Sequence, residues 1–449
     1  MEKLAKAGRG FRPERVLGLS FIITILVGTL LLLIPFSTRS GHIPFIDALF
    51  TATSAVCVTG LIVKDTPAYF STEGQVIILI LFQLGGLGIM TFSTLFLLVS
   101  GRKITIKEKI AVQRDFNYAI SGDFKALVKN IFFFTIIIEF IGILSLFLRW
   151  KEDFVLSKAL FYSVFHAISA FCNAGFSLFS DSFVSNRGDL WINITMIFLI
   201  ILGGLGFLVL QEGKELVLSR IQGKRICLSV HSKIVLFITS ALVLFSLLIF
   251  FLIEGNLSLR TLTYKEKLLV SLFQVVTPRT AGFNTIDLSF LSHASIFILF
   301  LLMFIGASPG STGGGIKTTS MGVIFAFLKS KVTARDSVNI FDRTLPLILV
   351  TRAFKVISLG LSVIFVSSLI LFLSEPVLGM QEVLFEVFSA FSTVGLSLGI
   401  TPKLSILGKL VIILTMYIGR IGPLTLLYVF SRPKALGKFE FPEGSVMIG

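Results

Sequence analysis

Long apolar runs separated by short polar segments recur from one end of the chain to the other. Four of them are continuous over approximately Val16 to Phe36, Val128 to Leu148, Ile234 to Ile253 and Ile348 to Leu373. Crossing a hydrocarbon core of about 30 Å takes about 20 apolar residues in a helix. Each of these runs is therefore predicted to be a transmembrane helix, and the fold class is an all-α polytopic membrane protein.

A short motif that ends in glycine follows each of the four runs. Ser54 to Gly60 reads SAVCVTG, and the motif returns as SAFCNAG ending at Gly175 and as SAFSTVG ending at Gly395. A degenerate copy, VTPRTAG, ends at Gly282. The segments before the glycines, such as Ile46 to Ala55, are too short to cross a bilayer. They are interpreted as re-entrant pore helices that end in a glycine turn.

A second apolar run follows each turn and contains a patch of glycines. The patches are Gly85 to Gly88, Gly203 to Gly206, Gly306 to Gly310 and Gly419 to Gly422. Glycine in a membrane helix allows close packing of backbones or a wider pore, and ordinary helix packing is an alternative for the first two patches. The sequence therefore predicts eight transmembrane helices and four pore helices, arranged as four fused membrane-pore-membrane units around a central pore.

The charged residues divide the chain, because Lys and Arg collect in alternate loops. The positive-inside rule places those loops in the cytoplasm, together with both termini. The predicted division is a cytoplasmic arm at 1–15, pore units at 16–100, 128–210, 234–328 and 348–431, cytoplasmic loops at 101–127, 211–233 and 329–347, and a cytoplasmic tail at 432–449. This spread also accounts for the net charge of +15. No nucleic-acid partner is expected, since no single domain carries the basic residues.

The four glycine turns are the candidate ion site. Non-helical backbone at membrane depth is tolerated only where it is buried in protein or lines a water-filled cavity, so the turns should meet. Their carbonyl oxygens could then replace the hydration shell of a monovalent cation, and glycine permits the backbone conformations that this requires. The candidate ion-binding residues are Val58, Thr59, Gly60, Asn173, Ala174, Gly175, Thr280, Ala281, Gly282, Thr393, Val394 and Gly395. None is charged, which favours a carbonyl site over a ring of carboxylates. The effect of Arg279, in the third turn, is open.

A glycine-rich stretch from Gly306 to Lys317 interrupts the second run of the third unit. Glycine and proline are unfavourable inside a helix, so this stretch predicts a flexible intramembrane loop below the turns that can obstruct ions. A nucleotide-binding loop is disfavoured, because no strand precedes it and the spacing differs from that of a P-loop. The candidate gating residues are Gly306, Pro309, Gly310, Gly313, Gly314, Gly315, Lys317 and Arg420.

Arg420 and Glu139 are ionisable residues inside apolar runs. Arg420 is interpreted as an electrostatic barrier on the conduction path, with a structural salt bridge as the alternative, because such residues usually face a cavity or a partner. Glu139 is interpreted as a partner between helices. The three cysteines and four histidines show no ligand spacing, so neither a resident metal nor a catalytic residue is expected.

These features resemble the superfamily of Trk, Ktr and HKT potassium transporters over nearly the whole chain, and within it the Ktr ion-translocating membrane subunit. The resemblance implies that Gly60, Gly175, Gly282 and Gly395 are the selectivity-filter glycines and that K⁺ binds the neighbouring carbonyls. Some relatives that conduct mainly Na⁺ place serine at the position of Gly60, so glycine here favours K⁺. The resemblance also assigns gating to the glycine-rich loop and a barrier role to Arg420.

The same resemblance implies the partners and the setting. It predicts a homodimer in the lipid of a bacterial cell membrane, on a cytosolic ring of RCK-type subunits that bind ATP or ADP, while this chain itself binds no nucleotide. Potassium uptake is the predicted function, with Na⁺ dependence as an added expectation. The alternatives are a secondary transporter of a small solute, which also uses broken helices, and a Na⁺-conducting relative of the same fold. A membrane enzyme is disfavoured, because the sequence has neither a histidine cluster nor paired intramembrane carboxylates.

Overall fold

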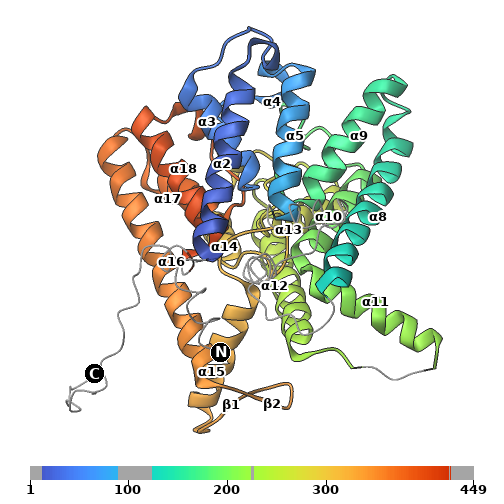
Figure 1. Cartoon of the computed structure of the whole chain (residues 1–449), viewed down its shortest axis with the longest axis vertical. Coiled ribbons are helices and arrows are strands. Elements are labelled where there is room, and N and C mark those ends of the chain that lie inside the picture. The colour runs from blue at the N-terminus through green and yellow to red at the C-terminus, as the bar shows by residue number, and fades with distance from the viewer. Residues whose placement is uncertain (1–12, 89–123, 224–226, 424, 426–449) are drawn as a thin grey trace, which may run out of the picture.

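The computed structural model describes residues 13–88, 124–223, 227–423 and 425, and these are mostly helical (Figure 1). The helices of the first half are α2 (Pro13–Leu33), α3 (Phe45–Val56), α4 (Thr66–Tyr69), α5 (Thr72–Leu87), α8 (Phe124–Trp150), α9 (Leu156–Phe171), α10 (Leu190–Leu205) and α11 (Phe207–Ile221). Those of the second half are α12 (Val230–Glu254), α13 (Tyr264–Val276), α14 (His293–Phe304), α15 (Thr318–Val332), α16 (Leu347–Ser374), α17 (Met380–Ser392) and α18 (Ile406–Ile421).

Short elements complete the described fold. Three 3₁₀ turns are η1 (Pro35–Ser37), η2 (Leu288–Phe290) and η3 (Thr401–Lys403). One antiparallel hairpin joins β1 (Val338–Ile340) to β2 (Arg343–Leu345), with Val338 opposite Leu345. In Figure 1 this hairpin and α15 lie at the end of the molecule opposite α3 and α4.

Four described helices, α2, α8, α12 and α16, are long and apolar enough to cross a membrane. They confirm that each of the four predicted first runs forms an apolar helix of spanning length. Each exposes large apolar side chains on its outer surface, such as Leu30, Ile136, Leu244 and Phe365, as expected where lipid replaces water. Helices α10 and α11 are bent by 103° and count as a fifth candidate if they are taken as one span. The count of eight spans therefore stays a prediction, and residues 89–123 lie outside the described part.

The second helix of each unit ends at its glycine patch. Helices α5, α10 and α18 stop at Gly88, Gly206 and Gly422, whose φ angles of 82°, 93° and 91° are rarely adopted by other residues. The first glycine of each of these patches lies against the carbonyl of the last or next-to-last residue of the pore helix. These contacts pair Gly85 with Val56, Gly203 with Phe171 and Gly419 with Phe391. Of the two roles considered for the patches, close backbone packing is the one found at these three glycines.

A repeated contact ties the start of each second helix to the end of the first helix of its unit. The N-terminal residues of α5, α10, α14 and α18 are capped by Ser71, Asp189, Ser292 and Ser405. Ser71 Oγ donates to Phe36 O (2.5 Å), Arg149 Nε to Asp189 Oδ2 (2.6 Å), Ser292 Oγ to Glu254 Oε1 (2.6 Å), and Ser405 N to Glu375 Oε1 (2.9 Å). A capping residue satisfies free helix N–H groups, so each contact fixes both helices at once.

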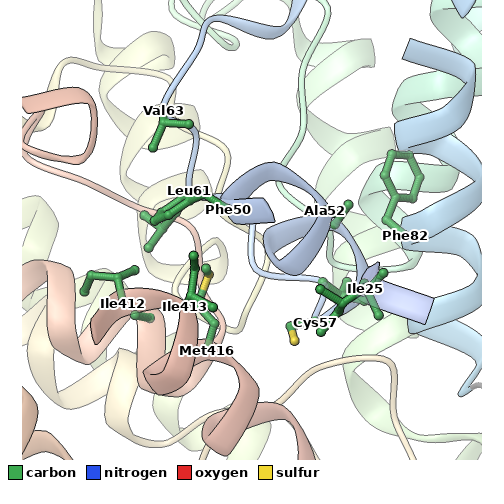
Figure 2. Packing of buried hydrophobic residues seen from close by; sticks show 14 of the residues in the cluster. Ile25, Phe50, Ala52, Cys57, Leu61, Val63, Phe82, Ile412, Ile413 and Met416 are labelled. Carbon is green, nitrogen blue, oxygen red and sulfur yellow. The ribbon is translucent and has the colours of Figure 1, made fainter. Parts of the chain in front are cut away.

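The first and fourth units pack against each other. One core cluster contains Phe50 and Leu61 from the first unit together with Ile412, Ile413 and Met416 of α18, as Figure 2 shows. A second cluster joins α8, α9 and α10 to residues of α13. The chain thus returns to its starting side, which brings its first and last glycine turns together.

Candidate ion pathway

All four glycine turns have the same alternating backbone. The glycines have left-handed φ angles of 90° at Gly60, 73° at Gly175, 78° at Gly282 and 93° at Gly395. Two positions earlier the backbone is left-handed again, with φ of 56° at Val58, 56° at Asn173, 71° at Thr280 and 51° at Thr393. Non-glycine residues seldom adopt this region unless the surrounding structure requires it. The shared conformation therefore indicates four copies of one specialised turn.

The four turns close a ring in chain order. A β-carbon built on Gly60 would lie 2.7 Å from Ala174 O and 2.8 Å from Gly175 Cα. The same construction brings Gly175 to Ala281 O, Gly282 to Val394 O and Gly395 to Thr59 O. Each glycine thus contacts the carbonyl that precedes the next glycine around the ring. Any side chain at these positions would collide with backbone, which explains the need for glycine.

Hydroxyl groups on the pore helices hold the turns. Ser54 Oγ accepts from Gly60 N (3.0 Å), and Ser389 Oγ accepts from Gly395 N (3.0 Å). In the other two units the hydroxyl donates instead, from Ser169 Oγ to Phe176 O (2.8 Å) and from Thr277 Oγ1 to Phe283 O (2.6 Å). The sequence motif showed the serines, but their role as turn supports was not recognised from it.

The third turn is longer because α13 ends at Val276, six positions before Gly282, whereas α3 ends four positions before Gly60. The extra length accommodates Arg279, whose side chain is only 4% exposed. Its Nη2 donates to Thr239 Oγ1 on α12 (3.3 Å), and its Nη1 has no hydrogen-bond partner among the described residues. Arg279 therefore reaches the first helix of its unit.

The glycine-rich loop separates α14 from α15, as predicted. Its two ends meet at a bridge between Ile305 and Ile316, and Ala307 N donates to Gly314 O (3.3 Å). Gly306 lies against Gly314 and Gly315, so glycine allows the two sides of the loop to close. The structure is a compact loop with a closed neck.

The loop lies against two of the glycine turns. Gly314 N donates to Thr393 Oγ1 (3.1 Å), and a β-carbon on Gly313 would collide with Thr280 Oγ1. Lys317 Nζ donates to Gly313 O (2.7 Å) and so binds the C-terminal end of the loop to its middle.

The loop also fills the break between α10 and α11. Phe207 N donates to Gly310 O (2.9 Å), and Ser308 N donates to Gly204 O (3.0 Å). Thr312 N and Oγ1 both donate to Gly203 O, at 3.2 and 3.1 Å. Pro309 O lies beside Gly206, where a β-carbon would meet it at 2.6 Å. The loop of the third unit is therefore hydrogen-bonded to the main chain of the second unit.

Arg420 joins the loop to a further unit. Its Nη1 donates to Thr312 O and its Nη2 to Gly85 O at the end of α5. The structure thus brings Arg420, the loop and the first glycine patch together. The sequence had placed Arg420 and the loop separately and gave no sign of Gly85 as their common neighbour.

Other polar contacts link units across the fold. Gln83 Nε2 on α5 donates to both carboxylate oxygens of Glu139 on α8 (2.9 and 3.2 Å), in agreement with its interpretation as a partner between helices. Asp47 on α3 pairs with Lys409 on α18 at 2.7 Å and with Lys64 at 3.7 Å. Among the described residues, no group of three or more His, Cys, Asp or Glu could hold a metal ion.

Four helices that are long and apolar enough to cross a membrane, together with four glycine turns in a ring, are typical of a multi-pass membrane protein. Residues 16–437 match the TrkH family, described as cation transport protein, and the chain belongs to this family.

Relatives agree over nearly the full length. The chain is 41% identical over 441 residues to the Ktr system potassium uptake protein B of Bacillus subtilis, covering 98% of this chain and 97% of that protein. It is 38% identical to the potassium/sodium uptake protein NtpJ of Enterococcus hirae, covering 97% of each. The crystal structure of the potassium transporter TrkH from Vibrio parahaemolyticus has the same fold, with a TM-score of 0.72 at 18% identity over 94% of this chain and 86% of that one.

Proposed function

We propose that the chain takes up K⁺ as the ion-translocating subunit of a Ktr-type system. The ring of four glycine turns carries this proposal. It presents the carbonyls of Thr59, Ala174, Ala281 and Val394 at the contacts between neighbouring turns. Main-chain carbonyls can replace the water around a monovalent cation without a formal charge that would bind the ion too tightly for release. Potassium uptake by relatives that match nearly the whole chain supports the choice of ion.

The arrangement of the pathway is part of the proposal. Each unit supplies one spanning helix, one pore helix that ends in a glycine turn, and one helix that ends at a glycine patch. We take these as four membrane-pore-membrane units, with residues 58–60, 173–175, 280–282 and 393–395 as the selectivity filter. Both termini then lie in the cytoplasm, where α11, α15 and the β1–β2 hairpin would face any partner.

The glycine-rich loop and Arg420 form the gate in this proposal. The loop contacts the turns at Thr280 and Thr393, and its Thr312 carbonyl is bound by Arg420. Backbone packed against a filter blocks the path of an ion until it moves, and a fixed positive charge repels a cation strongly where little water screens it. A homodimer on a nucleotide-binding cytosolic ring would supply the control, and Na⁺ would modulate uptake.

Growth and flux test the function. The chain, expressed with a compatible RCK-type subunit in a bacterium that lacks potassium uptake, should restore growth on limiting K⁺. Purified protein in liposomes should carry radioactive Rb⁺, a close mimic of K⁺, and unlabelled K⁺ should compete with it. A correctly inserted protein that gives neither growth nor flux would exclude potassium uptake.

A Na⁺-conducting relative is the second candidate, and the potassium/sodium name of the Enterococcus hirae relative favours testing it. In the same liposomes, Na⁺ competing with Rb⁺ as well as K⁺ does would identify that alternative. Stimulation of Rb⁺ flux by low Na⁺ without competition would instead support Na⁺ dependence.

A further inference from the structure

Two of the four pore helices carry an ionisable side chain nine positions before the turn glycine. In α9 this residue is His166, before Gly175, and in α17 it is Glu386, before Gly395. Both side chains are fully buried. Each contacts a serine two positions after the glycine of its own turn, so the same register recurs on both sides of the turn.

His166 holds the backbone that follows Gly175. Its Nε2 lies 3.1 Å from Ser177 Oγ and 3.1 Å from Leu178 N. A main-chain N–H can only donate, so Nε2 is the acceptor. The proton of the neutral ring is therefore on Nδ1, which donates to Tyr162 O (2.8 Å). The imidazole also stacks on Phe179 with ring centroids 4.9 Å apart, which fixes its orientation.

Glu386 makes the matching contacts in the fourth unit. Its Oε2 accepts from Ser397 Oγ (2.7 Å), and its Oε1 accepts from the hydroxyl of Thr401. Ser397 Oγ also accepts from Gly399 N (3.0 Å). In the second unit, Ser177 Oγ accepts from Phe179 N (2.9 Å). In both units the donating N–H belongs to the residue four positions after the turn glycine. The two serines thus occupy one local structure supported by different side chains.

The other two units do not have this support. The corresponding residue before Gly60 is Thr51, whose hydroxyl donates to Asp47 O of its own helix (2.8 Å), and the residue two positions after Gly60 is Ile62. Nine positions before Gly282 is Phe273, which is apolar. Gly60 contacts Gly175 and Gly395, and Gly282 contacts the same two glycines. Gly175 and Gly395 therefore lie across the ring from each other.

We propose that His166 and Glu386 are positioning residues for ion discrimination. This proposal rests on the function proposed above. They hold the backbone just beyond two opposite filter glycines. In the cavity-size account of selectivity, which this proposal uses, a carbonyl ring prefers the larger ion because it resists contraction around the smaller one. Buried hydrogen bonds on two opposite sides resist that contraction along one diagonal, so their loss should admit Na⁺ more easily than it lowers K⁺ flux.

The test measures the ratio of K⁺ to Na⁺ competition against Rb⁺ flux in liposomes. His166→Leu and Glu386→Ala should each reduce the discrimination between K⁺ and Na⁺ about tenfold. This is the factor by which the loss of one or two buried hydrogen bonds changes an equilibrium constant. Glu386→Gln should retain most of the discrimination, because the amide can still accept a hydrogen bond from one of the two hydroxyls and donate one to the other. Thr51→Val is the matched control at the same register, and it should leave the ratio unchanged.

Double variants separate positioning from general damage. Glu386→Ala combined with Ser397→Ala should be no worse than the stronger single variant, because both remove one contact. Glu386→Ala combined with His166→Leu should lose about another tenfold. If the leucine or alanine variants fail to fold, Ser177→Ala and Ser397→Ala remove only one hydroxyl each and carry the same test.

Variants that insert and conduct with the parental ratio would overturn the proposal, as would an equal change in Thr51→Val. Failure of the proposed function would be recognised separately, because in that case the unchanged protein itself would carry neither K⁺ nor Rb⁺.

Discussion

Arg420 donates a hydrogen bond to the main-chain carbonyl of Thr312, which ties the last described helix to the glycine-rich loop of the third unit. Its other terminal nitrogen binds Gly85 O of the first unit. The loop itself is bonded to Gly203 and Gly204 of the second. One side chain therefore connects the loop to an assembly that includes all four units, so that any displacement of the loop would break contacts in several of them.

Gly60→Ser should impair ion discrimination strongly. The serine β-carbon would collide with Ala174 O and Gly175 Cα, and the φ of 90° is unfavourable for it. We expect K⁺ preference over Na⁺ to fall at least about tenfold, because one carbonyl pair of the ring must move. Flux competition in liposomes measures this. Unchanged competition in a correctly inserted variant would place Gly60 outside the ion site.

Gly203→Ala should destabilise the fold, because its β-carbon would collide with Phe171 O. Overpacking of this kind costs about 1–3 kcal/mol. Gly213→Ala, in the next helix, is the matched control, since a β-carbon there meets nothing within 4 Å. Alanine at that position should be neutral or stabilise by up to about 1 kcal/mol. Thermal unfolding in detergent compares the two, and equal midpoints would contradict the packing role of the patch.

Asp47→Ala should weaken the contact between the first and fourth units. The carboxylate is 5% exposed and pairs with Lys409, which is 13% exposed. Leaving a completely buried charge without its partner costs several kcal/mol. Partial exposure reduces this to about 2–3 kcal/mol here.

Asp65→Ala is the control for that variant, because Asp65 also links two units, through Ser180 Oγ at 2.6 Å, but at an exposed position. It should cost less than about 1 kcal/mol. A lower midpoint of thermal unfolding for Asp65→Ala than for Asp47→Ala would show that the Asp47 pair does not hold the first and fourth units together.

Local patterns were the part of the molecule that the sequence could predict. Hydrophobic length identified the spans at α2, α8, α12 and α16, and the repeated motif located Gly60 and its three counterparts. The break at Gly206 was not foreseen, because apolar composition continues across a glycine that ends a helix. The pairing of Asp47 with Lys409 joins positions 362 residues apart, and no local signal marks such a contact. The same limit applies to Arg420 and Thr312.

Deletion of Gly310 to Gly314 should raise cation flux and make it less dependent on a cytosolic partner. The deletion removes the carbonyl that Arg420 binds and the Gly314 N–H that donates to Thr393. Arg420→Ala should act in the same direction, because it removes both a fixed positive charge and the contact that holds the loop.

The two changes should be strongly non-additive. Since Arg420 reaches the loop through Thr312 O, the deletion already removes that contact, and the double variant should leak little more than the stronger single one. Rb⁺ flux is measured for both single variants and the double, with and without the partner, and normalised to inserted protein. Ser362→Ala serves as the control, because its hydroxyl lies on the exposed surface and, among the described residues, bonds only to Ser358 O of its own helix (2.9 Å). A deletion that folds but conducts no faster than the parent would mean that the loop does not gate the pathway, and additive effects would mean that Arg420 acts on the ion independently of the loop.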